Sequence, residues 1–115
     1  KIKKNKNQPF FDIIIDDGSH NLSDILFAIK ILFKHLQPKG FYIIEDYKHP
    51  NYYTYNKDID DILIDQMLDN LKRKKIFSSN IINFNEQKFF QKEIRKIDIY
   101  KGNLNSSDIC FIEKK

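Results

Sequence analysis

The segment FDIIIDDGSH, residues 11–20, joins a hydrophobic run to an acidic turn. Phe10 to Ile15 is short, nearly continuous in hydrophobicity and rich in β-branched residues, which is typical of a strand covered on both faces in a parallel sheet. Asp16 and Asp17 follow, and Gly18 gives the backbone the freedom that a strand-end turn needs. The segment therefore predicts a buried parallel strand that ends in acids.

An amphipathic helix is predicted directly after this turn. Its apolar residues recur at the i, i+3, i+4, i+7 spacing of a helix that buries one stripe. They are Leu22, Ile25, Leu26, Ile29, Leu32, Phe33 and Leu36. Ser19 or Asn21 is expected to cap the start of the helix, and residues 37–40, Gln-Pro-Lys-Gly, are expected to end it.

A second buried strand is predicted at Phe41 to Ile44, and it ends in Glu45 and Asp46. Strand, helix and strand joined by short loops form a βαβ unit, which is parallel and right-handed in nearly all proteins. Residues 1–8 are expected to be a polar loop that leads into this unit. The sequence therefore predicts an α/β fold built on a parallel sheet.

The middle of the chain combines a tyrosine-rich loop with a second helix. Residues 47–57 read YKHPNYYTYNK, and we expect this loop either to wall a ligand or to pack on its own side chains. Asp58 is expected to cap a helix that runs to about Lys75. The buried face of this helix is predicted to carry Ile59, Ile62, Leu63, Met67 and Leu71.

The last forty residues are predicted to end in a β-hairpin. Residues 76–93 lack a clear period and are expected to be irregular, with a short helix near Glu86–Lys92. Ile94–Lys101 and Asp108–Lys114 are β-rich runs joined by a polar loop that contains glycine. This pattern indicates an antiparallel pair of strands.

Composition and charge narrow the class of protein. The net charge is +4, and lysine outnumbers arginine 18 to 2, which does not favour a nucleic-acid partner because base and phosphate recognition relies on arginine. The single cysteine, Cys110, excludes an internal disulfide framework and a cysteine zinc cluster, and we expect it to be buried. No apolar run is long enough to span a membrane, so we expect a cytoplasmic protein without a membrane partner.

Acidic residues follow both predicted parallel strands. Asp16 and Asp17 end the first strand, and Glu45 and Asp46 end the second. Ligand sites of open α/β sheets lie at the carboxyl ends of the strands, and neighbouring strands are about 4.8 Å apart. Carboxylates this close favour a hard cation, Mg²⁺ first, with Ca²⁺ or Mn²⁺ as alternatives. The competing interpretation is that these acids are solvated turn formers or helix caps.

His20 strengthens the case for chemistry at this edge. It lies three residues after Asp17, where a histidine beside a metal-bound hydroxyl can remove a proton. Taken alone, a surface histidine is the simpler interpretation. His35 and His49 have no comparable partners along the chain, and we interpret both as structural or solvent-facing.

The two segments FDIIIDDGSH and LQPKGFYIIEDY together resemble class I S-adenosylmethionine (SAM)-dependent methyltransferases. Within that group they are similar to the metal-dependent sugar O-methyltransferases of macrolide biosynthesis and the related cephalosporin hydroxylase family. In those proteins one strand ends in DDGSH and a later strand ends in a Glu-Asp pair. The closing hairpin also resembles the family's last two strands, of which the final one inserts beside the Glu-Asp strand. Lys39 replaces the first glycine of the family's usual Gly-Gly turn.

The resemblance implies a fold, a reaction and a set of site residues. It implies a partial Rossmann-like sheet of parallel strands with a C-terminal antiparallel hairpin and helices packed on the sheet. It implies Mg²⁺ bound by Asp17, Glu45 and Asp46, SAM bordered by Asp17 and Gly18, and His20 as the general base. The implied reaction is methyl transfer from SAM to a hydroxyl of a sugar or other small polyol.

The resemblance also implies that part of the methyltransferase domain is missing from this sequence. The family's glycine-rich SAM loop is expected upstream of Lys1, so residues 1–115 are expected to form a single partial domain, the C-terminal half of a methyltransferase domain, and to be inactive alone. One alternative is a non-catalytic half-domain, or degenerate remnant, that completes its sheet against another chain. A weaker alternative is a Mg²⁺-dependent hydrolase. The oligomeric state is left open.

Overall fold

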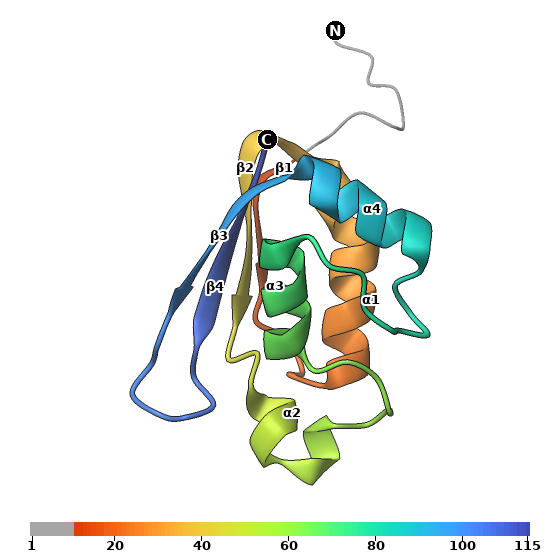
Figure 1. Ribbon diagram of the computed structural model, residues 1–115. Coiled ribbons are helices and arrows are strands. Elements are labelled where there is room, and N and C mark those ends of the chain that lie inside the picture. The colour runs from red at the N-terminus through yellow and green to blue at the C-terminus, as the bar shows by residue number, and fades with distance from the viewer. Residues whose placement is uncertain (1–10) are drawn as a thin grey trace, which may run out of the picture.

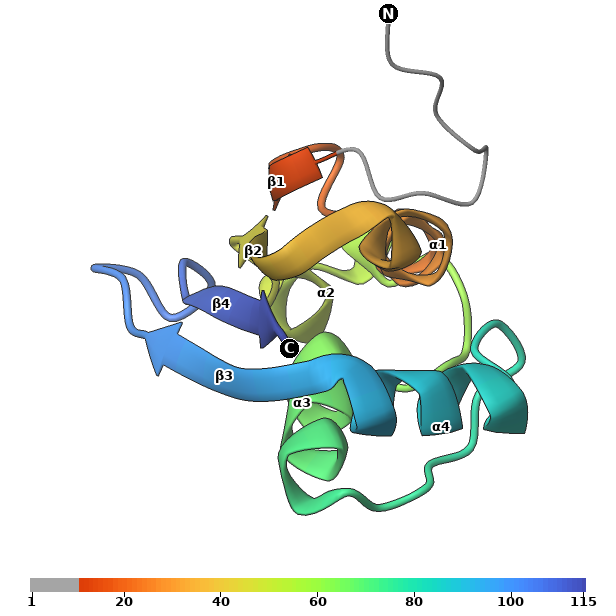
Figure 2. The same ribbon diagram turned by 90° about the horizontal axis from the view of Figure 1, so that it is seen from above.

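Four strands form one mixed sheet, and the helices lie on one face of it (Figures 1 and 2). The computed structural model describes residues 11–115. The strands are β1 (Phe11–Asp16), β2 (Leu36–Glu45), β3 (Ile94–Tyr100) and β4 (Ile109–Lys114). The helices are α1 (Leu22–Leu32), α2 (His49–Tyr52), α3 (Ile64–Arg73) and α4 (Phe84–Glu93), with 3₁₀ turns at Phe33–His35 and Thr54–Asn56. The predictions for residues 1–8 and for Phe10 lie outside the described residues.

The sheet confirms the predicted βαβ unit and the predicted hairpin. Its strand order is β1-β2-β4-β3, with β1 parallel to β2 and with β4 antiparallel to both of its neighbours. The last strand in the chain therefore inserts next to the strand that ends in Glu45, as the family resemblance implied. The partial Rossmann-like α/β fold is confirmed.

The start of β2 differs from the prediction. The strand begins at Leu36 rather than at Phe41, and its pairing with β1 is irregular near this end. Gly40 is needed here, because an added Cβ would lie 2.7 Å from the Asp12 carbonyl oxygen and 2.9 Å from that of Gln37. The absence of a side chain thus lets the two parallel strands approach each other.

The hydrophobic core lies between the sheet and the helices. Phe33, at the end of α1, is fully buried, and its ring lies 5.4 Å from that of Phe90 in α4 and 6.4 Å from that of Tyr42 in β2. Cys110 is buried as predicted, and burial raises the pKa of its thiol to about 12. Among the described residues, no helix has the length and apolar character that crossing a bilayer requires.

The opposite face of the sheet is open. Phe11, Ile13 and Ile15 of β1 are 47%, 57% and 58% exposed, and Tyr100 of β3 is 58% exposed. Only the Ile14 side of β1 faces the helices. The prediction of a strand covered on both faces is therefore wrong for β1 within the described residues. The strand does lie at an edge of the sheet, where it pairs with β2 alone.

The second helix begins later than predicted. Residues 57–63 are not helical, and α3 starts at Ile64 and ends at Arg73, where Lys74 takes a left-handed conformation with φ 55°. The Asp58 carboxylate does not cap this helix. Instead it accepts hydrogen bonds from the backbone N–H and the hydroxyl of Ser23, the second residue of α1. A tertiary contact therefore replaces the local cap that the sequence predicted.

The short helix near Glu86–Lys92 is confirmed as the longer helix α4. The Asn83 side chain accepts a hydrogen bond from the Glu86 backbone N–H at 2.9 Å. The Glu86 carboxylate accepts one from the Asn83 N–H at 2.8 Å. This reciprocal pair is a capping box, and it fixes the start of α4.

Changing Asp58 to Asn is expected to destabilise the fold by about 1 kcal/mol, because the free N–H of Ser23 at the start of α1 loses its anionic acceptor. Hydrogen bonds from Ser23 hold the pKa of Asp58 below its ordinary value of 3.8. The contribution of the ionised Asp58 to stability is therefore complete above the unfolded-state pKa of 3.8. It is lost as the pH falls through the lower pKa of the folded state. Urea unfolding of the chain and of D58N at neutral pH and at about pH 3 tests this. The difference in unfolding free energy between the unchanged chain and D58N should be smaller at acid pH. D60N is the control, because Asp60 is an exposed residue close to Asp58 in the chain.

Candidate metal and catalytic site

The parallel pairing of β1 and β2 places two acidic strand ends side by side. Asp16 is the register partner of Ile44, so the two strands end at the same edge of the sheet. Asp17 directly follows β1, and Asp46 directly follows β2. The shared edge is what the sequence predicted for these acids.

His20 lies between the two acidic ends. Its Nε2 atom is 4.0 Å from Oδ1 of Asp17 and 3.9 Å from Oδ2 of Asp46. The His20 side chain is 22% exposed, and those of Asp17 and Asp46 are 56% and 34% exposed. Both carboxylates therefore flank the same imidazole nitrogen, although Asp17 is not part of the group of described ligand atoms that lie within 4.8 Å of one another. Carboxylate oxygens are ligands that Mg²⁺ prefers, but Asp17 lies outside the close group of ligand atoms that contains Asp46.

Glu45 takes a different position from Asp17 and Asp46. It is the last residue of β2 and the register partner of Ile109 in β4. Ile44, its neighbour in the strand, is fully buried on the helix-covered face, so Glu45 projects toward the open face. Among the described residues, Glu45 belongs to no group of ligand atoms gathered closely enough to hold an ion.

Two residues of the site have left-handed backbone conformations. His20 has φ 64° and Asp46 has φ 53°. Such conformations cost on the order of 1 kcal/mol for residues other than glycine, and they cluster at functional sites. Here they occur in the turns after β1 and β2, at residues whose side chains approach each other.

Asn56 ties the loop that carries His20 to the tyrosine-rich segment. Its side chain is buried, and Nδ2 donates to the Ser19 carbonyl oxygen at 3.3 Å and to Asn21 Oδ1 at 2.9 Å. These two acceptors flank His20 in the chain. Asn21 is at the N-cap position, as predicted, but its side chain makes no cap bond to α1.

His49 is a site residue that the sequence analysis missed. Its ring centroid lies 4.4 Å from that of His20 and 5.2 Å from that of Tyr53. The interpretation of His49 as structural or solvent-facing is therefore incomplete. One signal was available: His49 follows Asp46 by three residues, just as His20 follows Asp17. Each strand end thus carries an Asp-x-x-His sequence.

Asp16 differs from Asp17 in its surroundings. Burial raises the pKa of Asp16, although its Oδ1 accepts a hydrogen bond from the Gly18 N–H at 3.3 Å. Its Oδ2 is buried and has no hydrogen-bond partner among the described residues. The neighbouring acid Asp17 is exposed instead. The two adjacent carboxylates are therefore suited to different roles, and Asp17 is the one that a ligand can reach.

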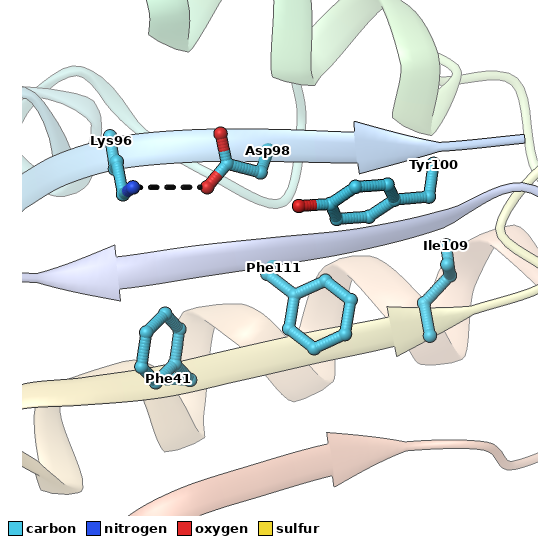
Figure 3. A pocket seen from close by; sticks show the side chains of 6 residues that line it. All are labelled: Phe41, Lys96, Asp98, Tyr100, Ile109 and Phe111. Atoms are coloured by element: carbon cyan, nitrogen blue, oxygen red, sulfur yellow. Dashed lines mark ion pairs between the residues drawn. The ribbon is translucent and has the colours of Figure 1, made fainter.

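A hollow of the described surface lies away from this cluster. It has a volume of about 540 Å³ and is formed by β2, β4 and β3 on the open face of the sheet (Figure 3). Its lining residues are Phe41, Lys96, Asp98, Tyr100, Ile109 and Phe111. The walls are largely aromatic, and the charges present, Lys96 and Asp98, pair with each other at 3.4 Å. Besides this ion pair, the Tyr100 hydroxyl is the polar group among the side chains that line the hollow, so the wall offers few groups that would orient a substrate.

Sequence comparison finds partial relatives among sugar O-methyltransferases. No protein-family model matches the chain. The chain is 50% identical over 36 residues to L-olivosyl-oleandolide 3-O-methyltransferase of Streptomyces antibioticus and to mycinamicin VI 2''-O-methyltransferase of Micromonospora griseorubida. Each match covers 31% of this chain and 9% of the relative. The chain therefore matches only a small part of these enzymes.

Structural comparison agrees with the sequence comparison. The chain matches a structure of the MycE methyltransferase from the mycinamycin biosynthetic pathway, a complex with Mg and SAH, with a TM-score of 0.65 and 27% identity. A second crystal form gives a TM-score of 0.64 and 25% identity. The first match covers 90% of this chain and 25% of that protein. The resemblance to the macrolide sugar O-methyltransferases is thereby confirmed.

Proposed function

We propose that this chain is part of a SAM-dependent, Mg²⁺-dependent O-methyltransferase that acts on a hydroxyl of a sugar or other small polyol. One observation carries the proposal: His20 lies about 4 Å from both Asp17 and Asp46 at the ends of two parallel strands. The similarity to sugar O-methyltransferases, and to a methyltransferase bound to Mg and SAH, supports it. We place the protein in the cytoplasm, with a small-molecule acceptor.

Asp17, Glu45 and Asp46 would hold the Mg²⁺ ion. Asp17 and Asp46 both flank His20, whereas Glu45, which projects toward the open face of the sheet, would have to turn toward them to complete the set. A bound Mg²⁺ would orient the acceptor hydroxyl and make it more acidic. The chain's own contribution is to present oxygen donors at fixed strand ends.

His20 would act as the general base. Its Nε2 atom lies about 4 Å from both carboxylates, and the side chain is partly exposed, so an acceptor hydroxyl can reach it. When His20 takes the proton at Nε2, the ring becomes positively charged. Asp17 and Asp46 stabilise that charge because both lie about 4 Å from the same nitrogen. Asn56 keeps the loop in place by holding both residues that flank His20 in the chain.

Asp17 and Gly18 would border SAM, which supplies the methyl group. Both residues are exposed at the end of β1, so a cofactor can reach them. Glycine-rich phosphate- or dinucleotide-binding motifs are absent from the sequence, which has only three glycines. We propose that residues 1–115 form one partial domain and that the remaining SAM contacts come from an upstream segment of the same protein.

A non-catalytic half-domain is the second candidate function. The specific observation in its favour is the open apolar face of the sheet, with β1 at an unpaired edge among the described strands. Such an edge can pair with another chain. The close approach of His20 to two carboxylates favours the enzyme instead, because sheet pairing does not require it.

Calorimetry with SAM separates these two functions. The full gene product should bind SAM, and D17N should weaken both SAM and Mg²⁺ binding because Asp17 would border both ligands. E113Q, which changes a carboxylate that pairs with Arg95 away from the site, is the matched control. Absence of SAM binding by the folded full-length protein, with and without Mg²⁺, would contradict the methyltransferase proposal and favour the half-domain.

A further inference from the structure

We propose that His20, Asp46 and His49 form a binding site for a divalent transition-metal ion of the Co²⁺–Zn²⁺ group. This donor set differs from the all-carboxylate set proposed for Mg²⁺, although Asp46 belongs to both and the ligand His20 is also the general base of the proposed reaction. The inference rests on the geometry of three side chains and does not depend on methyl transfer.

The three side chains are close enough to share one ion. Each offers one ligand atom, and the three atoms lie within 4.8 Å of one another. His20 Nε2 and Asp46 Oδ2 are 3.9 Å apart. Around an ion with bonds near 2.1 Å, adjacent ligand atoms are about 3.0–3.4 Å apart. Closing the His20–Asp46 gap takes roughly half an ångström to one ångström, and pairs separated by up to 4.8 Å must close by as much as about 1.8 Å, which rotations of the three side chains would have to supply.

The chemistry of the ligands selects the class of metal. Two imidazole nitrogens and one carboxylate oxygen suit Co²⁺, Ni²⁺, Cu²⁺ and Zn²⁺, whereas Mg²⁺ prefers oxygen ligands throughout. The three ligands come from the two Asp-x-x-His sequences, residues 17–20 and 46–49. Of the two aspartates and two histidines in these sequences, Asp17 is the one that is not part of the ligand set. Each of the three side chains is partly exposed, so an ion can enter and keep water in its open positions.

The surroundings hold the three ligands in place before an ion arrives. His20 and Asp46 have left-handed backbones, which direct their side chains toward each other. The Tyr53 ring packs edge-on against the His49 ring, with centroids 5.2 Å apart. Asn56 fixes the loop that carries His20. Such preorganisation lowers the entropic cost of assembling a site.

Titration of the whole chain with Co²⁺ alone tests the inference, because bound Co²⁺ gives visible ligand-field bands. We expect saturable binding of one Co²⁺ per chain that excess Mg²⁺ does not displace. H20Q and H49Q should each weaken binding by at least about tenfold, since each removes a direct ligand. H35Q is the matched control, because His35 is the third histidine and follows α1 at its opposite end.

A second measurement uses the unchanged chain, so its result does not depend on whether the variants fold correctly. Paramagnetic Co²⁺ should broaden the imidazole NMR signals of His20 and His49 and leave those of His35 sharp. Equal broadening of all three histidines, or Co²⁺ affinity unchanged in H49Q, would overturn the inference. Neither readout involves SAM, so failure here is distinct from failure of the methyltransferase proposal.

Discussion

Changing His20 to Gln is expected to lower methyl transfer by the full gene product by about 10²–10⁴-fold, the usual contribution of a general base. Glutamine keeps the size and polarity of the side chain but cannot accept the proton of the acceptor hydroxyl. The measurement is kcat for SAH formation from SAM, with a panel of hydroxyl-bearing sugars as acceptors and saturating Mg²⁺. The affinities for SAM and Mg²⁺ should stay near those of the unchanged protein.

The matched control for this variant is H35Q, which alters a histidine beyond the far end of α1. Its kcat should equal that of the unchanged protein. If H20Q turns over as fast as H35Q, His20 is not the base. If instead H20Q loses Mg²⁺ affinity along with activity, His20 acts on the metal site rather than on the hydroxyl proton.

Changing Phe33 to Ala is expected to lower the free energy of unfolding by about 3–5 kcal/mol. Phe33 is fully buried, and its ring meets those of Tyr42, Phe89 and Phe90 from the sheet and α4. Domains of this size have a total stability of about 5–15 kcal/mol, so the variant is expected to lose a large share of it. Urea unfolding followed by circular dichroism measures the loss.

Phe27 provides the control within the same helix. It is 46% exposed, so F27A removes an aromatic ring from α1 without opening a buried cavity. We expect F27A to cost less than about 1 kcal/mol. Equal losses for F33A and F27A would mean that the junction between α1, the sheet and α4 is not the centre of the core.

The elements predicted correctly from the sequence are those with a strong local period. The stripe from Leu22 to Phe33 marks α1, and the β-rich runs near residues 94–101 and 108–114 mark the hairpin. These patterns identify a buried face without knowledge of its partner. The convergence of Asp17 and Asp46 on one edge also followed from the sequence, because parallel strands end together.

The elements predicted wrongly depend on partners far away in the chain. Residues 58–63 have helix-like spacing, but the Asp58 and Asp61 carboxylates bond to the backbone N–H groups of Ser23 and Asn80 instead. These contacts span 35 and 19 residues, beyond any local pattern. The contact between His49 and His20 also joins two distant strand ends, although the repeated Asp-x-x-His sequence was a local signal for His49.

The position of β4 constrains how this part of the protein can fold during synthesis. The last of the described strands to leave the ribosome, Ile109–Lys114, is the one that bridges β2 and β3. Until it emerges, β3 has no neighbour in the described sheet, and β2 has only β1. Translation must therefore pass residue 114 before this sheet can close, and a nascent chain stalled earlier would expose one edge of β2 and both edges of β3 to chaperones and proteases.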